Sequence, residues 1–350
     1  MDKINKKLDI RSLSLNELKN QLESLGEKSF RAKQIYEWLW EKSCTDFDEM
    51  SNLSKSLREV LKEKFCINAV KINTSQLSED RTIKNAFKLY DSNIIEGVLI
   101  PTTERMTACV SSQVGCSLSC KFCATGYMDR KRNVNADEIY DQVVLINRQA
   151  EENYKKPLTN IVYMGMGEPL LNYSNVLRSI DRITAPDGLN IASRRITVST
   201  AGIAKMIKKL GDDEVRFNLA LSLHAANDKK RNKIMPINEQ NTLEALAEAL
   251  KYYYAKTNNP VTYEYIVFND FNDELSDAAE LAAFCKHVPC KVNIIEYNPI
   301  SFASYTNANV DKVEVFAEFL RKKGINTYVR KSRGKDIDAA CGQLAVKEKA

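Results

Sequence analysis

The sequence contains no long hydrophobic run. None of its apolar stretches approaches the roughly 20 residues that a helix needs to cross a bilayer, and residues 1–7 lack the apolar core of a signal peptide. Internal repeats and low-complexity segments are absent as well. We therefore expect a cytoplasmic protein with no membrane association.

Histidine is scarce, and the cysteine count does not suit a disulfide framework. The two histidines, His224 and His287, lie far apart, and no second C-x2-C follows Cys120 and Cys123. This disfavours a structural zinc site, which needs four Cys or His ligands around one ion. Nine cysteines, an odd number, do not match the paired bridges of small secreted proteins, and a reducing compartment keeps thiolates free to bind a cluster.

The composition is that of an ordinary globular protein. A chain of 350 residues is long enough for one large domain, or for one domain with a small accessory unit. Its hydrophobic content of 44% and charged content of 28% give no sign of disorder. The net charge of +5 permits nucleic-acid binding but does not establish it, because what matters is whether the positive charge gathers on one face.

Three closely spaced cysteines are the most informative feature. Cys116, Cys120 and Cys123 form a C-x3-C-x2-C run within one short stretch. Three thiolates leave one iron of a 4Fe-4S cluster without a protein ligand, whereas clusters that only transfer electrons are normally held by four. The open iron indicates a cluster that binds a substrate. Incidental thiols and a zinc module are the alternatives.

The cysteine run, with Phe122 before its last cysteine, resembles the signature of the radical S-adenosylmethionine enzymes. This resemblance implies a 4Fe-4S cluster ligated by Cys116, Cys120 and Cys123. It also implies S-adenosylmethionine as a second cofactor, which binds the open iron through the amino and carboxylate groups of its methionine part.

Apolar periodicity divides the chain into three regions. Residues 1–75 have a helical pattern, in which Ser14 and Glu17 form a capping box, and we expect a small helical accessory domain. Residues 76–105 have the alternation of a β-hairpin. Residues 106–350 then alternate short apolar runs with amphipathic stretches. Strands are predicted near 107–112, 160–164, 195–199, 216–222, 261–267 and 291–295, and helices near 136–150, 174–184, 203–210, 241–254, 276–286 and 310–323.

Six β-then-α units predict an α/β fold with a parallel sheet and helices outside it. A closed barrel of this kind needs eight units, so a partial barrel is favoured, although spacing alone leaves a doubly wound sheet open. The shared fold of the resembled family is a partial (β/α)6 barrel, which decides between the two.

Polar residues and glycines follow the predicted strands, where parallel α/β folds place their functional groups. The Gly-x-Gly-Glu turn at 165–168 and the segments 199–202, 222–225 and 296–299 each follow one strand. The resemblance implies that these strand ends contact the cofactor, and we expect a hydrogen-bonding role for His224 rather than proton transfer. The implied cofactor-binding residues are Gly167, Glu168, Ser199, Ser222, Leu223, His224 and Asn298.

The C-terminal stretch narrows the resemblance. Residues 321–335 hold seven basic residues and no acidic one, and they lead into Gly334-Lys-Asp-Ile-Asp-Ala-Ala-Cys-Gly-Gln-Leu344. That segment is similar to a motif of the radical ribosomal RNA adenine methyltransferases, and Cys109 to Cys116 matches the same family. The resemblance covers nearly the whole chain.

The resemblance also implies roles for residues outside the cluster. Carbon 2 of adenine is electron-poor and has no lone pair, so it cannot attack the methyl group of S-adenosylmethionine directly. In this family Cys341 is methylated first, and the 5'-deoxyadenosyl radical from a second cofactor molecule takes a hydrogen from that methyl group. The methyl carbon then adds to the ring, and Cys109 releases the product by forming a transient disulfide. Glu96 is implied as the proton acceptor, although an acidic residue in a hairpin is more often at the surface.

The implied partners are 23S ribosomal RNA, transfer RNA as a second substrate, and an electron donor such as flavodoxin or ferredoxin, with the protein acting as a monomer. A related branch methylates carbon 8 of adenine and confers antibiotic resistance, and Pro169 favours the carbon-2 branch. The other alternative is a non-catalytic iron-sulfur protein that binds RNA through its basic C-terminal stretch.

Overall fold

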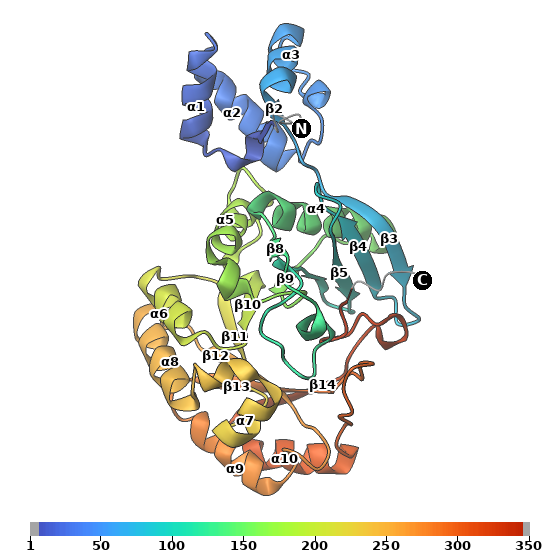
Figure 1. Ribbon diagram of the computed structural model, residues 1–350, viewed down its shortest axis with the longest axis vertical. Helices are drawn as coiled ribbons and strands as arrows, with labels where there is room; N and C mark the ends of the chain where they lie inside the picture. The colour runs from blue at the N-terminus through green and yellow to red at the C-terminus, as the bar shows by residue number, and fades with distance from the viewer. Residues whose placement is uncertain (1–6, 346–350) are drawn as a thin grey trace.

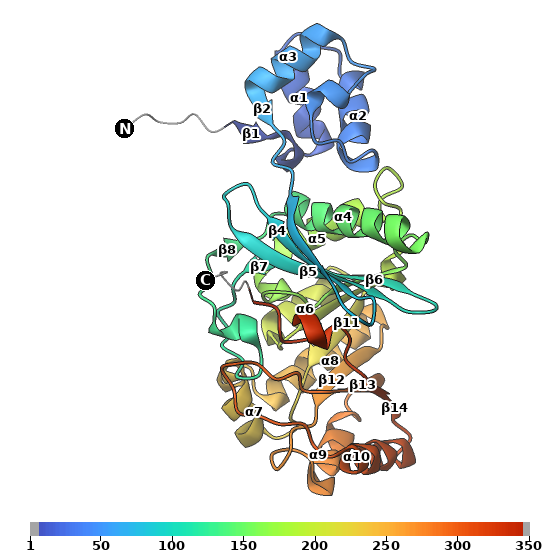
Figure 2. The ribbon, with the colours of Figure 1, turned by 90° about the vertical axis from the view of Figure 1, so that its right-hand side faces the viewer.

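The computed structural model describes residues 7–345 of the chain. Figure 1 shows a small helical unit, formed by the N-terminal residues, above a larger body that is built on one sheet. A linking segment runs from the small unit directly into the edge of this sheet (Figure 2). Among the described residues, no helix has the length and apolarity that a membrane span requires.

The central sheet has ten strands in the order β14-β13-β12-β11-β10-β9-β6-β5-β4-β3. The strands from β6 through β9 to β14 are parallel, and β3, β4, β5 and β6 pair antiparallel at the other edge. The sheet is therefore an open, partial barrel extended by an antiparallel meander. Its strands are β3 (Lys71–Leu77), β4 (Ile83–Lys88), β5 (Ile94–Pro101), β6 (Met106–Cys109), β9 (Asn160–Tyr163), β10 (Ile196–Thr200), β11 (Asn218–Ser222), β12 (Val261–Ile266), β13 (Cys290–Ile295) and β14 (Asn326–Arg330).

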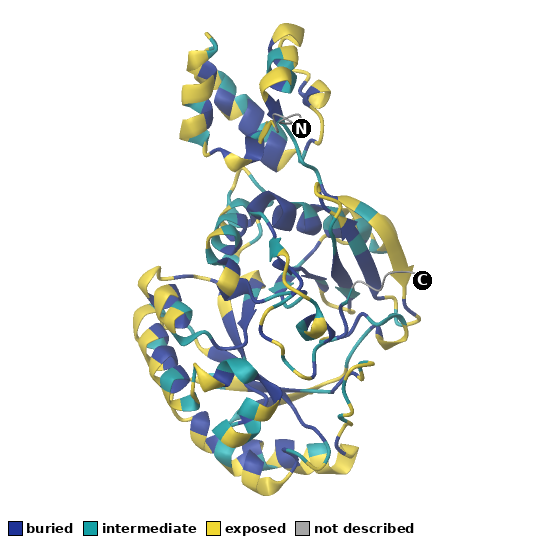
Figure 3. Ribbon diagram, viewed as in Figure 1, coloured by how far each residue is buried: buried dark blue, intermediate teal, exposed yellow. Residues whose placement is uncertain are grey.

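Helices follow the parallel strands and cover the outer side of the sheet (Figures 1 and 2). Their sheet-facing sides are buried and their other sides are exposed (Figure 3), which is the pattern expected of amphipathic helices around a core. The helices of the larger body are α4 (Ala136–Tyr154), α5 (Tyr173–Thr184), α6 (Ala204–Asp212), α7 (Asp228–Ile234), α8 (Leu243–Thr257), α9 (Leu275–Phe284) and α10 (Val310–Lys322).

The N-terminal unit consists of three α-helices, short 3-10 and π-helical turns and one short strand pair. The capping box of Ser14 and Glu17 forms as predicted and begins the first helix. The elements are β1 (Leu8–Asp9), α1 (Leu15–Ser24), α2 (Phe30–Tyr36), a π-helical turn η2 (Glu37–Glu41), α3 (Lys55–Lys64) and β2 (Phe65–Cys66).

A buried ionic cluster joins this unit to helix α4. The Arg11 guanidinium is 2% exposed and lies 2.7 Å from Asp141 and 3.4 Å from Asp137, both on α4, and 3.5 Å from Asp9. Burial opposes the charge, but the three carboxylates outweigh it and raise the pKa of Arg11 above its ordinary value. Docking of the N-terminal unit therefore brings Arg11 within ion-pair distance of two carboxylates that its own unit does not supply.

The six predicted strand-helix units are all present, within a few residues of their predicted ends. Several elements were not predicted, among them the short strand pairs β1–β2 and β7–β8 (Gln113–Val114 and Arg132–Asn133) and three further elements. Strand β3 begins at Lys71, before the boundary expected at 75, and makes the hairpin a three-stranded extension of the sheet. Strand β14 adds a seventh parallel strand, and α7 is a short helix inserted between β11 and α8.

Candidate active site

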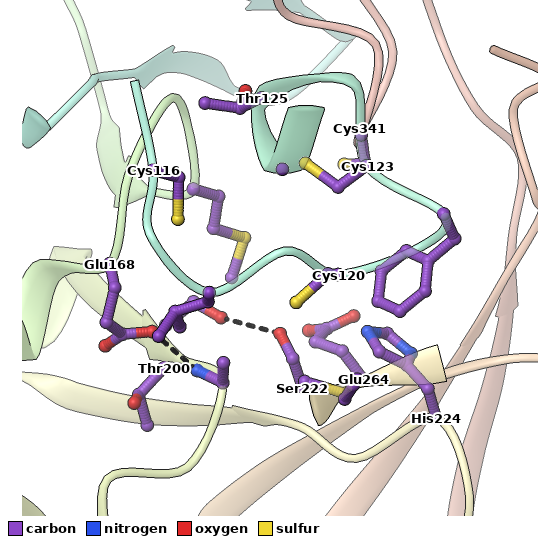
Figure 4. A pocket seen from close by; sticks show the side chains of 18 of the residues that line it. Cys116, Cys120, Cys123, Thr125, Glu168, Thr200, Ser222, His224, Glu264 and Cys341 are labelled. Carbon is purple, nitrogen blue, oxygen red and sulfur yellow. Dashed lines mark hydrogen bonds between the residues drawn. The ribbon is translucent and has the colours of Figure 1, made fainter. Parts of the chain in front are cut away.

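A pocket of about 970 Å³, including its open mouth, lies at the carboxyl ends of the parallel strands. Its walls come from the cysteine loop, from the turns after β9, β10 and β11, from the ends of β12 and β13, and from the C-terminal segment. Cys116, Cys120, Cys123, Glu168, Ser222, His224, Glu264 and Cys341 line it (Figure 4).

The cysteine loop is held in a shape that turns its thiols inward. Gly115 has a φ of +76°, and a Cβ there would lie 2.1 Å from the carbonyl oxygen of Asp129, so only glycine fits. The amide of Cys116 then bonds to the carbonyl of Met128 on the returning strand of the loop. Figure 4 shows the sulfur atoms of Cys116, Cys120 and Cys123 facing one common space.

This arrangement fits a 4Fe-4S cluster with three protein ligands. Among residues 7–345, no three His, Cys, Asp or Glu side chains converge on a single ion. Three thiolates that each bind a different iron of one cube need not converge in that way. The common space between the three sulfurs belongs to the pocket, so a fourth, open iron would face the other pocket walls.

The turn after β9 places a buried carboxylate against the pocket. Gly167 has a φ of +92°, and a Cβ there would lie 2.4 Å from Cβ of Gln113. This close approach brings Glu168 into the interior, where its carboxylate accepts hydrogen bonds from the amides of Leu170 (3.0 Å) and Ala201 (2.7 Å). Burial raises the pKa of Glu168, while these two bonds oppose the rise. Further lone pairs on its oxygens can accept a bond from an ammonium group.

The turns after β10 and β11 add hydroxyl groups and an imidazole. The hydroxyls of Ser199 and Ser222 lie 3.3 Å apart on neighbouring strands. His224 has a φ of +54°, its Nδ1 accepts a bond from the amide of Ile266 (3.1 Å), and its ring packs edge-on against Phe122. Burial lowers the pKa of His224 to about 3, so the ring is neutral and its Nε2 carries the proton. A neutral ring of this tautomer can donate a hydrogen bond from Nε2.

Two residues that the sequence did not single out also shape the site. Arg231, on α7, is fully buried and donates to the carbonyls of Ala201, Ser222 and Leu223, so it ties the turns after β10 and β11 together. Glu264, on β12, is 7% exposed, lines the pocket and accepts a bond from the Asn293 amide (2.7 Å). No motif marks either residue, because α7 is short and β12 has the pattern of an ordinary buried strand.

The C-terminal segment closes over the cysteine loop. The carbonyl of Gly342 accepts a bond from the amide of Ala124 (2.7 Å), and the Thr125 hydroxyl donates to the carbonyl of Leu344 (2.6 Å). Asn298 donates to the carbonyl of Cys341 (3.0 Å). These bonds hold the Cys341 thiol on the pocket wall beside the cluster cysteines (Figure 4). The thiol is exposed, yet neighbouring chain desolvates it and raises its pKa to about 11.

Cys109 and Glu96 lie behind the pocket wall, on β6 and β5. Both cysteines, Cys109 and Cys341, are free thiols. Burial raises the pKa of Cys109, and the nearby Cys341 raises it further, so the two are within electrostatic range of each other. Glu96 is 6% exposed and lies 3.3 Å from Lys84, which contradicts the expectation that a hairpin acid lies at the surface. Its Oε2 is buried without a hydrogen bond.

The structure thus gathers most of the predicted residues at one pocket. Cys116, Cys120, Cys123, Gly167, Glu168, Ser199, Ser222, His224 and Cys341 line it. Leu223, Asn298, Cys109 and Glu96 lie outside the lining. Leu223 is fully buried, and Asn298 has an amide oxygen that is buried without a partner.

Comparisons with known proteins agree with this geometry. Residues 8–67 match the N-terminal domain of ribosomal RNA large subunit methyltransferases, and residues 110–282 match the radical SAM superfamily. A protein of Cytophaga hutchinsonii, named a probable dual-specificity RNA methyltransferase RlmN, is 63% identical over 98% of this chain and 94% of its own length. The chain belongs to the RlmN family.

Other RlmN proteins are similar over the same extent. That of Bacillus velezensis is 43% identical over 97% of this chain and 93% of its own length. A crystal structure of a radical SAM methyltransferase from Sphaerobacter thermophilus superimposes with a TM-score of 0.92 at 39% identity, covering 97% of this chain and all of that one. The protein is therefore a radical SAM methyltransferase with the partial (β/α)6 barrel predicted from its sequence, and a 4Fe-4S cluster and S-adenosylmethionine are the cofactors of that superfamily.

Proposed function

We propose that this protein methylates carbon 2 of a specific adenine in 23S ribosomal RNA, and of an adenine in transfer RNA, with electrons supplied by a donor such as flavodoxin or ferredoxin. The observation that carries the proposal is that cysteines from two distant segments of the chain line one pocket. Three thiols from one loop face a common space, and Cys341, from a segment far away in the sequence, lies on the same wall. An iron-sulfur protein that only binds RNA has no need of this fourth thiol.

The bound cofactors supply the methyl group and the radical that activates it. Cys116, Cys120 and Cys123 would hold the cluster, and Glu168 would accept a hydrogen bond from the ammonium group of the methionine part. Ser199, Ser222 and the Nε2 proton of His224 offer hydrogen bonds to the rest of the cofactor. Leu223 and Asn298 act from behind the wall, Leu223 through its backbone and Asn298 through its free amide oxygen.

Cys341 accepts the methyl group on sulfur, and its position on the pocket wall keeps that methyl group close to the cofactor. After the methyl carbon has joined the adenine ring, the RNA is bound covalently to Cys341. Cys109 attacks the Cys341 sulfur, so that a disulfide forms as the carbon-sulfur bond breaks, and the methylene carbon takes up a proton to become the new methyl group. One electron leaves the radical adduct in this step, and the electron donor later supplies the two electrons that reduce the disulfide to two thiols. Glu96 takes the proton lost from the ring, since its carboxylate is buried beside the C-terminal segment that carries Cys341 and one of its oxygens has no hydrogen bond.

Mass spectrometry of nucleosides from cells with and without the gene tests the proposal. We expect 2-methyladenosine in 23S ribosomal RNA and in transfer RNA to disappear with the gene and to return with the wild-type copy but not with a Cys341→Ala copy. Loss of 8-methyladenosine instead would assign the protein to the carbon-8 branch. Unchanged adenosine methylation in both RNAs would refute the proposal.

A further inference from the structure

Two exposed aromatic rings stack on each other beside the pocket. The rings of Tyr127 and Phe302 have centroids 5.0 Å apart and planes only 24° from parallel. Tyr127 is 43% exposed and Phe302 is 62% exposed. A single exposed ring is common on a protein surface, but two exposed rings in contact form a contiguous apolar patch of the kind that marks a binding surface.

The two rings come from segments that form the pocket rim. Tyr127 ends the short helix η4 (Ala124–Tyr127), whose Thr125 and Gly126 line the pocket, and its hydroxyl donates to the carbonyl of Lys121 (3.1 Å). Phe302 lies in the loop after β13, which leaves the pocket at Glu296. The contact between the two rings places this loop next to η4. The stacked pair therefore lies next to residues that line the pocket.

We propose that Tyr127 and Phe302 form a platform on which an unpaired base of the RNA substrate stacks, next to the adenine that enters the pocket. The inference rests on the proposed function. An enzyme that modifies a base inside a pocket takes that base out of its stack, which leaves the neighbouring base without a stacking partner. Aromatic side chains are the usual protein replacement, because every base has a flat face.

The charges around the pair suit a phosphate backbone. Lys121, Arg130 and Lys131 are exposed in the same loop, and in the described part of the chain none of them lies within ion-pair distance of a carboxylate. Asp129 offsets one of these positive charges. An acidic electron-donor protein would be attracted by the same charges, but it would not require two flat rings held parallel, and this favours RNA.

Replacing Phe302 separates stacking from simple apolar contact. Binding of an RNA hairpin that contains the target adenine is measured for the wild type, Phe302→Ala, Phe302→Leu and Phe302→Trp, with 2-aminopurine placed in turn on either side of that adenine. Since loss of one base-stacking side chain weakens binding by about fivefold to about a hundredfold, we expect that loss for Ala and Leu and wild-type binding for Trp. At one of the two positions, 2-aminopurine fluorescence should be quenched by the wild type and by Trp but not by Ala.

Tyr252→Ala is the matched control, because it removes another exposed ring, on helix α8. This variant should leave RNA binding unchanged. The iron content and the thermal midpoint of each variant show whether it is folded. Unchanged RNA affinity of folded Phe302→Ala would overturn the inference, as would an effect confined to cluster reduction by flavodoxin. If the wild type methylates the RNA, either result refutes only the stacking platform and leaves the proposed function unaffected. If the wild type methylates no RNA, the proposed function itself is refuted.

Discussion

At the scale of single residues, two thiols of the same chemistry have different surroundings. Cys341 is exposed on the pocket wall, whereas Cys109 is 7% exposed within the sheet. The methyl group can therefore reach Cys341 directly from the pocket, and Cys109 can act only on a group already attached to its neighbour. This difference in access predicts different products from the two substitutions.

Cys341→Ala should keep its cluster but transfer no methyl group and form no adduct, because the accepting sulfur is gone. Cys109→Ala should load a methyl group on Cys341 and add it to the ring, but it should not release the product. Denaturing gels should then show protein covalently bound to RNA, as a shifted band that nuclease removes. Normal turnover by Cys109→Ala, or an RNA adduct with Cys341→Ala, would contradict the two-cysteine mechanism.

Replacing Cys116, Cys120 or Cys123 by Ala should remove the cluster, since two thiolates do not hold the cube. Iron content should fall from about four atoms per chain to near zero, and cleavage of S-adenosylmethionine to 5'-deoxyadenosine should stop. Cys44→Ala is a suitable control, because Cys44 is a buried thiol of the N-terminal unit. A cluster-loop variant that keeps both the brown absorbance and the cleavage would refute the ligand assignment.

The raised pKa of the buried Glu96 carboxylate leads us to predict that RNA methylation loses rate at a higher pH than an ordinary glutamate would give. Burial raises its pKa and Asp338 adds to the rise, while Lys84 opposes it. A base acts in its ionised form, so the single-turnover rate should fall with decreasing pH at a higher pH than an ordinary glutamate, near 4.3, would give. Glu96→Gln should slow the reaction by about a hundredfold or more.

The variant Lys84→Met tests in which direction the pH dependence of the rate shifts. Without the ammonium group the ionised form of Glu96 is less stable, its pKa rises further, and the acid limb of the rate profile should move to higher pH. A limb that stays in place or moves to lower pH would show that another group accepts the proton.

At the scale of elements, the basic stretch 321–335 does not act as one surface. Arg321 and Lys322 lie within 4 Å of Glu318 on α10, Arg333 lies 3.4 Å from Asp80, and Lys335 lies 2.8 Å from Glu296. Arg330 and Lys331, at and after the end of β14, are exposed, and neither lies in an ion pair among residues 7–345. Within this stretch, these two cations and the exposed Lys323, which follows α10, are therefore the ones available for RNA phosphates.

Arg330→Ala combined with Lys331→Ala should weaken RNA binding and reduce the slope of log K against log salt by about 1.4 to 1.8, because each phosphate contact contributes about 0.7 to 0.9. Arg321→Ala is the control, since its charge is already paired, and its slope should equal that of the wild type. Titrations at several salt concentrations measure the slopes. A double variant with the wild-type slope would make this stretch an ordinary solvated surface.

At the scale of the whole molecule, the N-terminal unit is joined to the barrel through buried charge. Arg11→Met should destabilise the protein by about 3 to 5 kcal/mol, because it leaves buried carboxylates of Asp9, Asp137 and Asp141 without their cation. Thermal unfolding and limited proteolysis of the segment after α3 measure the loss. Lys28→Ala, an exposed cation of the same unit, should change neither. An unchanged midpoint for Arg11→Met would mean that the remaining contacts hold the two parts together, among them the hydrogen bonds from Tyr140 to the Trp40 carbonyl and from Arg178 to the Arg11 carbonyl.

Local patterns in the sequence determined much of this protein. The Ser14 capping box, the six strand-helix units and the three-cysteine loop depend on residues close to one another in the chain, so their structures follow from spacing and propensity. The resemblance to a known family added the roles of Cys341 and Cys109, which no local pattern shows.

Only the tertiary structure decided which distant residues meet. Glu96 has the sequence surroundings of a surface acid, but it is buried because Lys84 on the adjacent strand and the C-terminal segment cover it. Arg231 joins turns that follow two different strands, and Tyr127 stacks on Phe302 from the opposite half of the chain. Such contacts depend on how the sheet curves and where loops return, and periodicity along the sequence carries no information about either.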